Sequence, residues 1–173
     1  MGAAWDEIVR TLPDGQEIVR VGARLFTALV IGALIGLQRE LTHHSAGLRT
    51  HMLVALGSAL LVVSAAEAGM APTDVSRIIQ GIVTGIGFLG GGAILKLTDE
   101  REIRGLTTAA GIWMTAAEGV AAGLGRIGTA LLGLVFTLFV LSALAKVERR
   151  LGHRALKDAE NKPGSITSSR VDP

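Results

Sequence analysis

Five long apolar tracts, separated by clusters of charged residues, dominate the sequence. They are Val21–Leu37, His51–Ala66, Ile78–Leu95, Gly105–Leu124 and Ile127–Ala145. A helix needs about 20 residues to cross a bilayer, so the last three tracts nearly suffice alone, whereas the first two must extend into polar flanks. We therefore predict an all-α, polytopic integral membrane protein with about five transmembrane helices.

The composition supports a membrane protein and excludes several other classes. Hydrophobic residues make up 49% of the chain and charged residues 18%, against roughly 25% charged residues in soluble domains. The absence of cysteine excludes a disulfide scaffold and a thiolate metal site, and a net charge of +2 is too small for nucleic-acid binding. The four histidines have no clustered partners, so we predict no enzyme activity and no cofactor.

The distribution of apolar and polar residues divides the chain into three predicted segments. Residues 1–18 are predicted to form an interfacial segment, because Trp5, Ile8, Val9 and Leu12 fall on one face of a helix. Residues 19–151 form the transmembrane domain. Residues 152–173 are polar and are predicted to form a disordered cytoplasmic tail.

The distribution of basic residues predicts the orientation. With five spans, five Lys and Arg residues lie on the side of the N-terminus and twelve lie on the opposite side. Cytoplasmic segments carry the excess of Lys and Arg, so we expect the N-terminus outside and the C-terminus in the cytoplasm.

Similar strings recur about 60 residues apart. Gly32–Ile35 ends the first span and Gly47–Thr50 opens the second, while Gly92–Leu95 ends the third and Gly105–Thr108 opens the fourth. These strings predict a tandem repeat of one helical hairpin, a plan that recurs in transport-type membrane proteins; chance similarity between Gly-Ala-Leu tracts is the alternative.

The third tract contains a dense run of glycines. Gly81 and Gly85 are four residues apart, the spacing that lets membrane helices approach closely, so we expect this helix to pack tightly. The alternative is that Gly90–Gly92 unwinds the helix beside a polar cavity and forms an ion site.

Two ionisable residues lie within the apolar tracts. Arg24 and Glu118 have opposite charges and comparable predicted depths, roughly 8 and 9 Å from the same membrane face. Because unpaired charge is costly in a bilayer, we predict an Arg24–Glu118 ion pair; a cation or proton pathway through Glu118, and snorkelling of the side chains to the surface, are the alternatives.

Charged residues also gather on the predicted cytoplasmic side, where Glu40 lies near Arg39 and Arg49. Solvated ion pairs are the simplest interpretation. Because magnesium needs only one or two carboxylates in addition to water, Glu40 is a candidate magnesium ligand, as is Glu118. Arg49 and Arg104 are expected to bind lipid headgroups or partner carboxylates.

Four motifs resemble the membrane domain of the MgtC/SapB family. They are Gly36–Glu40, Ala46–Thr50, Gly85–Gly90 and Arg104–Ala110, the last followed by Trp113. The residues singled out from these motifs and the spans are Arg24, Gly36, Arg39, Arg49, Gly85, Gly87, Gly90, Arg104, Thr107, Thr108 and Trp113.

The resemblance implies a bacterial inner-membrane protein of magnesium homeostasis and growth at low magnesium. Some members are thought to restrain the ATP synthase, and many carry a C-terminal ACT-like domain that is not found after Leu151 here. Two functions remain open: a non-enzymatic regulator of another membrane complex, or a transporter or channel for magnesium. Small-residue helix faces also suggest a homodimer.

Overall fold

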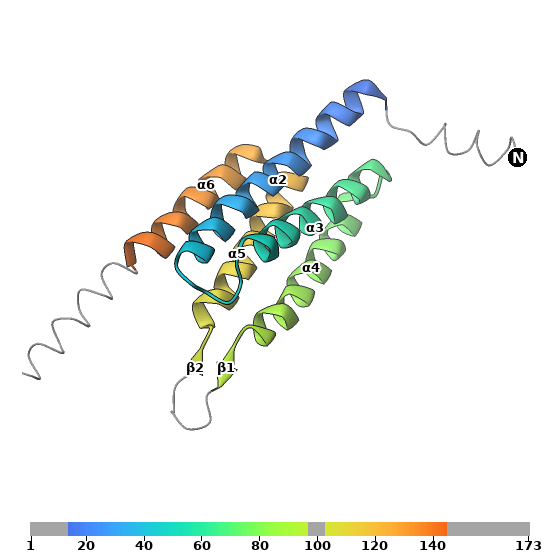
Figure 1. The fold of residues 1–173 in the computed structure, drawn as a ribbon. Coiled ribbons are helices and arrows are strands. Elements are labelled where there is room, and N and C mark those ends of the chain that lie inside the picture. The colour runs from blue at the N-terminus through green and yellow to red at the C-terminus, as the bar shows by residue number, and fades with distance from the viewer. Residues whose placement is uncertain (1–13, 97–102, 145–173) are drawn as a thin grey trace, which may run out of the picture. The chain divides into compact units, whose positions relative to one another are not determined.

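The computed structural model describes residues 14–96 and 103–144 (Figure 1). Its helices are α2 (Gly15–Leu41), α3 (Leu48–Glu67), α4 (Pro72–Gly92), α5 (Leu106–Gly123) and α6 (Ile127–Phe139), which continues into the π-helical turn η1 (Val140–Leu144). The two-residue strands β1 (Leu95–Lys96) and β2 (Ile103–Arg104) pair antiparallel, with Leu95 opposite Arg104. One helix thus covers each predicted tract, and the all-α prediction is confirmed.

The chain divides into two compact units between Thr137 and Leu138. All the helix packing described below belongs to the first unit. Of the second unit, the structure describes the end of α6 and η1.

The first two helices extend beyond their apolar tracts into polar flanks, as predicted. Helix α2 has 27 residues and α3 has 20, and these two are long and apolar enough to cross a membrane. Helix α5 has 18 residues, and α6 together with the π-helical turn η1 runs from Ile127 to Leu144. Helix α2 gains its length from polar flanks of good helix formers, and its first turn is capped by Asp14, whose side chain accepts a hydrogen bond from the Glu17 N–H.

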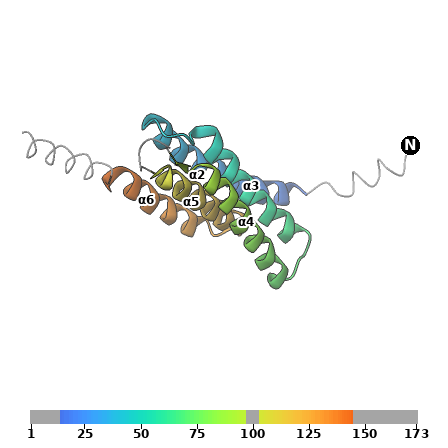
Figure 2. The ribbon, with the colours of Figure 1, turned by 90° about the horizontal axis from the view of Figure 1, so that it is seen from below.

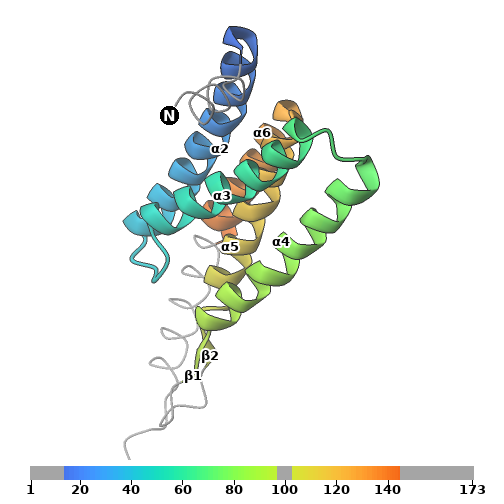
Figure 3. The same ribbon diagram turned by 90° about the vertical axis from the view of Figure 1, so that its right-hand side faces the viewer.

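Helix α5 occupies the centre of the first unit. It packs against α2, α3 and α4, and α3 also packs along α2 (Figures 1 and 2). Helix α4 runs along α5 and diverges from α3 over part of its length (Figure 3). The core is made of small and β-branched side chains, which permit short distances between helix axes: Ala28, Ile31, Ile35, Ala55, Ala59, Val62, Ile112, Ala116 and Ala122.

Four glycines bring α2 and α5 against the backbone of α3. A Cβ at Gly32 would lie 2.6 Å from the His51 carbonyl oxygen, and one at Gly36 would lie 2.7 Å from the Leu48 Cα. Gly119 and Gly123 of α5 likewise face the carbonyl oxygens of Ala55 and Ala59. These contacts are the close helix packing that small residues allow in membranes.

The prediction of tight packing at Gly81 and Gly85 was wrong for the described chain. A Cβ at either position would have no atom within 4 Å, and both glycines line an apolar groove of about 610 Å³ between α3 and α4. Helix α4 also continues unbroken to Gly92, so the alternative of an unwound helix is wrong as well. Glycine spacing alone did not reveal which glycines face a neighbouring backbone.

The two predicted hairpins are present as α2–α3 and α4–α5. Gly47 and Gly105 are the N-cap residues of α3 and α5, as the recurring Gly-Leu-x-Thr string predicts. Gly105 has φ +96°, and a Cβ there would clash with the Ala93 carbonyl, so glycine is required. The copies differ at the preceding helix: α2 continues past Ile35 to Leu41, whereas α4 ends at Gly92.

Two predictions lie outside the described residues. They concern the interfacial helix before residue 14 and the tail after residue 151.

Candidate functional site

Buried polar side chains follow one side of α5. Thr108, Thr115 and Glu118 are each at most 3% exposed, and each bonds to a side chain of a different helix. The six residues of these three contacts are called the α5 polar seam below: Arg39, His51, Thr108, Thr115, Glu118 and Thr137.

Arg39 of α2 lies at one end of the seam. Its side chain is 1% exposed, and its Nη2 donates to the Thr108 Oγ1 at 2.6 Å. The Nε has no hydrogen-bond partner, and none of the ion pairs among the described residues includes Arg39. A buried guanidinium is costly unless it is compensated, so this cation is a functional candidate.

His51 of α3 lies next in the seam. Its Nδ1 is 2.7 Å from the Thr115 Oγ1, and that hydroxyl donates its own proton to the Gly111 carbonyl at 2.9 Å. Because a hydroxyl has one proton, a Thr115 hydroxyl that donates to Gly111 receives a proton from the Nδ1 of the ring, and the neutral ring then leaves Nε2 as an acceptor. Nε2 is buried and has no partner.

Glu118 of α5 completes the seam. Its Oε1 accepts a hydrogen bond from the Thr137 hydroxyl of α6 at 2.8 Å, while Oε2 is buried without a partner. A Cβ at Gly133 would lie 3.3 Å from the Glu118 Cγ, so the glycine leaves room for this side chain beside α6.

The predicted ion pair between Arg24 and Glu118 was wrong. Arg24 Nη1 donates to the Gly123 carbonyl oxygen at 3.2 Å, and its guanidinium lies against Gly125. Its charge therefore stabilises the C-terminal end of α5, where carbonyl groups lack helical partners. Depth and charge sign alone could not distinguish this helix terminus from a carboxylate.

Glu40 has a clear structural contact at the end of α2. Its Oε2 accepts a hydrogen bond from the Leu48 N–H at 2.8 Å and so caps α3. With Arg49 and Thr50 it also lines a polar pocket of about 540 Å³. Among the described residues, no three His, Asp or Glu side chains gather around a metal position, and magnesium binding by Glu40 or Glu118 stays a prediction.

The other residues singled out from the sequence have different environments. Gly36 and Gly90 contact neighbouring helices, whereas Gly85 and Gly87 face open space. The remaining side chains are exposed: Arg49, Arg104, Thr107 and Trp113.

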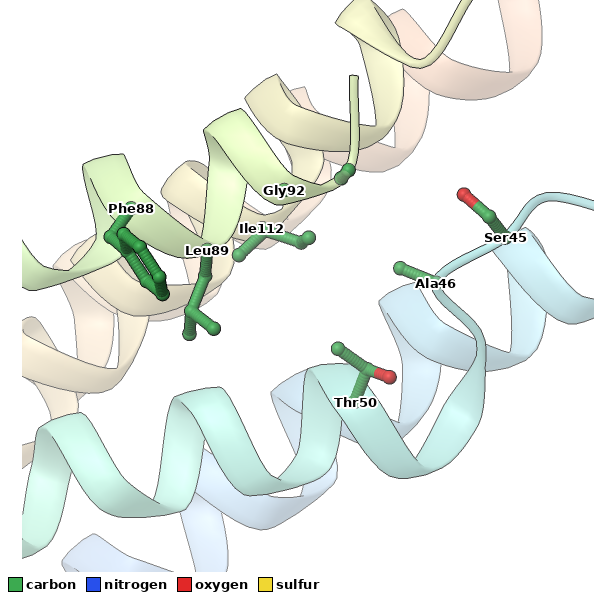
Figure 4. Close-up of a pocket in the computed structure, with 8 residues that line it drawn as sticks. Ser45, Ala46, Thr50, Phe88, Leu89, Gly92 and Ile112 are labelled. Atoms are coloured by element: carbon green, nitrogen blue, oxygen red, sulfur yellow. The ribbon is translucent and has the colours of Figure 1, made fainter. Parts of the chain in front are cut away.

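A second pocket, shown in Figure 4, lies between the start of α3 and the end of α4. It has a volume of about 410 Å³ and apolar walls that include Phe88, Leu89 and Ile112. Ser45 comes from the loop after α2, and Thr50 projects from α3 toward this space. Thr50, in the first turn of α3, lines both pockets.

Sequence reasoning missed half of the seam. It treated His51 as an isolated histidine and did not single out Thr115 or Thr137. A detectable signal was the seven-residue spacing of Thr108 and Thr115, which puts two hydroxyls on one face of an apolar helix.

Comparison with known proteins finds a matching family and several similar sequences. The family model described as the MgtC family matches residues 25–150. The chain is 41% identical over 149 residues to the protein SrpB of Synechococcus elongatus, a match covering 80% of this chain and 81% of SrpB.

Two further relatives are longer than the matched region. MgtC of Brucella abortus is 39% identical over 86% of this chain and 61% of its own length. YhiD of Escherichia coli, whose name provisionally assigns it magnesium transport, is 40% identical over 74% of this chain and 62% of its own length. The chain thus spans about three fifths of these two relatives. No solved structure gives a significant match.

Proposed function

The chain belongs to the MgtC family of magnesium-related membrane proteins, and from that premise we propose that it is a non-enzymatic regulator of another membrane complex. The proposal places it in the bacterial inner membrane with a cytoplasmic C-terminus, as the distribution of basic residues favours.

The buried charge of Arg39 is the observation that carries the proposal. Magnesium crossing the three-helix core of α2, α3 and α5 would have to pass a buried guanidinium that no carboxylate of the described chain neutralises. Fixed positive charge in a narrow pathway repels cations, so this core is poorly suited to magnesium conduction. The close contacts of Gly32, Gly36 and Gly119 with α3 further support a packed core.

Transport of magnesium is the second candidate, favoured by one observation. Glu118 is a buried carboxylate whose Oε2 has no partner, as expected of a residue on an ion pathway. The name of YhiD agrees with this alternative.

Magnesium flux into proteoliposomes with a trapped indicator dye separates the two functions. We expect no flux above that of empty liposomes, for the wild type and for a Glu118→Gln variant alike. Flux in the wild type that Glu118→Gln abolishes would overturn the regulator and establish the transporter.

A second assay tests regulation directly. The ATP synthase is the partner that the family resemblance suggests, so ATP hydrolysis and proton pumping are compared in inverted membrane vesicles with and without the chain. We expect the chain to lower both rates. Equal rates at matched expression would contradict this partner, and cross-linking in the same membranes would then test the homodimer and other complexes.

A further inference from the structure

The two pockets that share Thr50 at the start of α3 differ in chemistry. One has apolar walls formed by Phe88, Leu89 and Ile112. The other is lined by Glu40 and Arg49, and Thr50 belongs to both. A ligand that fills the pair must therefore be apolar at one end and charged at the other.

The charged pocket offers one group of each sign. Arg49 is exposed, and the hydrogen bonds and ion pairs of the described residues leave its guanidinium unpaired. Glu40 uses Oε2 to cap α3, so its carboxylate charge and Oε1 remain available to the pocket. A zwitterion with a phosphate and an ammonium group complements this pair of charges.

The position of the pockets matches a membrane lipid. Glu40 and Arg49 lie at the polar ends of α2 and α3, where apolar tracts meet charged residues, and this is the level of lipid headgroups. Phe88, on the last turns of α4, lines the apolar pocket and is 85% exposed, so this side of the pocket is open to the surroundings of the helices and a chain can enter from the bilayer.

We propose that these two pockets together bind one aminophospholipid, with its phosphate on Arg49, its primary ammonium on Glu40 and the start of an acyl chain against Phe88, Leu89 and Ile112. Thr50 lies at the junction, where its hydroxyl can bond the ester region of the lipid. This inference is independent of whether the protein regulates or transports.

Native mass spectrometry of the full chain tests the proposal. The protein is released from detergent micelles containing equal amounts of phosphatidylethanolamine, phosphatidylcholine and phosphatidylglycerol, and each retained lipid is counted. We expect preferential retention of phosphatidylethanolamine. Phosphatidylcholine lacks an N–H for Glu40, and phosphatidylglycerol lacks the ammonium group.

Three variants locate the site. Arg49→Ala and Glu40→Gln should each weaken retention about three- to tenfold, and the glutamine oxygen still allows the cap on Leu48. Gly92→Leu should fill the apolar pocket, since a Cβ there meets no atom within 4 Å. The matched controls are Arg126→Ala and Gly91→Leu, an exposed arginine and an open glycine that line neither pocket.

The outcomes are decisive. Equal retention of the three lipids, or stronger retention of phosphatidylglycerol, would overturn the proposal. So would Arg49→Ala and Gly92→Leu variants that retain as much phosphatidylethanolamine as their controls. Thermal unfolding of each variant without added lipid confirms that lost retention is not lost folding.

Discussion

Four glycines on α2 and α5 and five of the six glycines on α4 have opposite environments in the same small fold. The packed glycines lie against the α3 backbone, and the open glycines have no atom within 4 Å of the position that a Cβ would occupy. The packed set is Gly32, Gly36, Gly119 and Gly123, and the open set is Gly81, Gly85, Gly87, Gly91 and Gly92.

The comparison shows that glycine density is a poor guide to helix contact. The sequence is richest in glycine along α4, yet the shortest approaches between helices occur at two glycine pairs with four-residue spacing, Gly32 with Gly36 on α2 and Gly119 with Gly123 on α5. One contact of the α5 polar seam, His51 with Thr115, joins the same two helices as the close approaches of Gly119 and Gly123, whereas the other two contacts join α5 to α2 and α6. Between α3 and α5, close approach and a buried polar contact thus occur together, since short side chains such as threonine can bond only across a short distance.

The largest loss of folding stability is expected from placing a side chain at a packed glycine. Gly119→Leu should destabilise the fold by more than about 3 kcal/mol, because the Ala55 backbone cannot move away. Gly85→Leu is the matched control and should leave stability nearly unchanged. Unfolding by SDS titration in mixed micelles measures both, and equal losses for the two variants would break the comparison.

Removal of one polar partner from the α5 polar seam should strongly lower the free energy of unfolding. Thr108→Val leaves the Arg39 guanidinium buried without its one hydrogen-bond acceptor, and we expect a loss of about 2–4 kcal/mol. Thr107→Val, at the exposed neighbouring position, should change stability by less than about 0.5 kcal/mol. A double variant with Arg39→Met should recover part of the loss, because no buried charge then remains.

Thr115→Val should lower the free energy of unfolding by about 1–3 kcal/mol, less than Thr108→Val does. The reason is that the His51 ring that loses its partner is neutral in the deduced tautomer. Nitrogen-15 NMR of labelled histidine checks the premise. The wild-type ring should show a protonated Nδ1 and an unprotonated Nε2. The opposite tautomer would contradict the assigned direction of the hydrogen bond.

Sequence reasoning predicted the helices well because hydropathy is a property of whole segments. It placed one helix on each tract and identified Gly47 and Gly105 as helix starts. It failed for contacts between helices, because these depend on which residues of different helices face each other. Arg24 and Glu118 have comparable predicted depths and opposite charges but lie against different neighbours, and no pattern within one helix records that.

Substitution of an open glycine by alanine should raise the free energy of unfolding slightly, in contrast to the losses expected above. Gly81→Ala adds a methyl group where no atom lies within 4 Å, and alanine is a better helix former than glycine by about 1 kcal/mol. We therefore expect a gain of about 0.5–1 kcal/mol, whereas Gly123→Ala, facing the Ala59 carbonyl, should lose stability. The same substitution then has opposite signs on two helices, measured in the same unfolding titration. A loss at Gly81 would mean that α4 packs against another helix in the membrane, and the groove between α3 and α4 would then be occupied in the assembled protein.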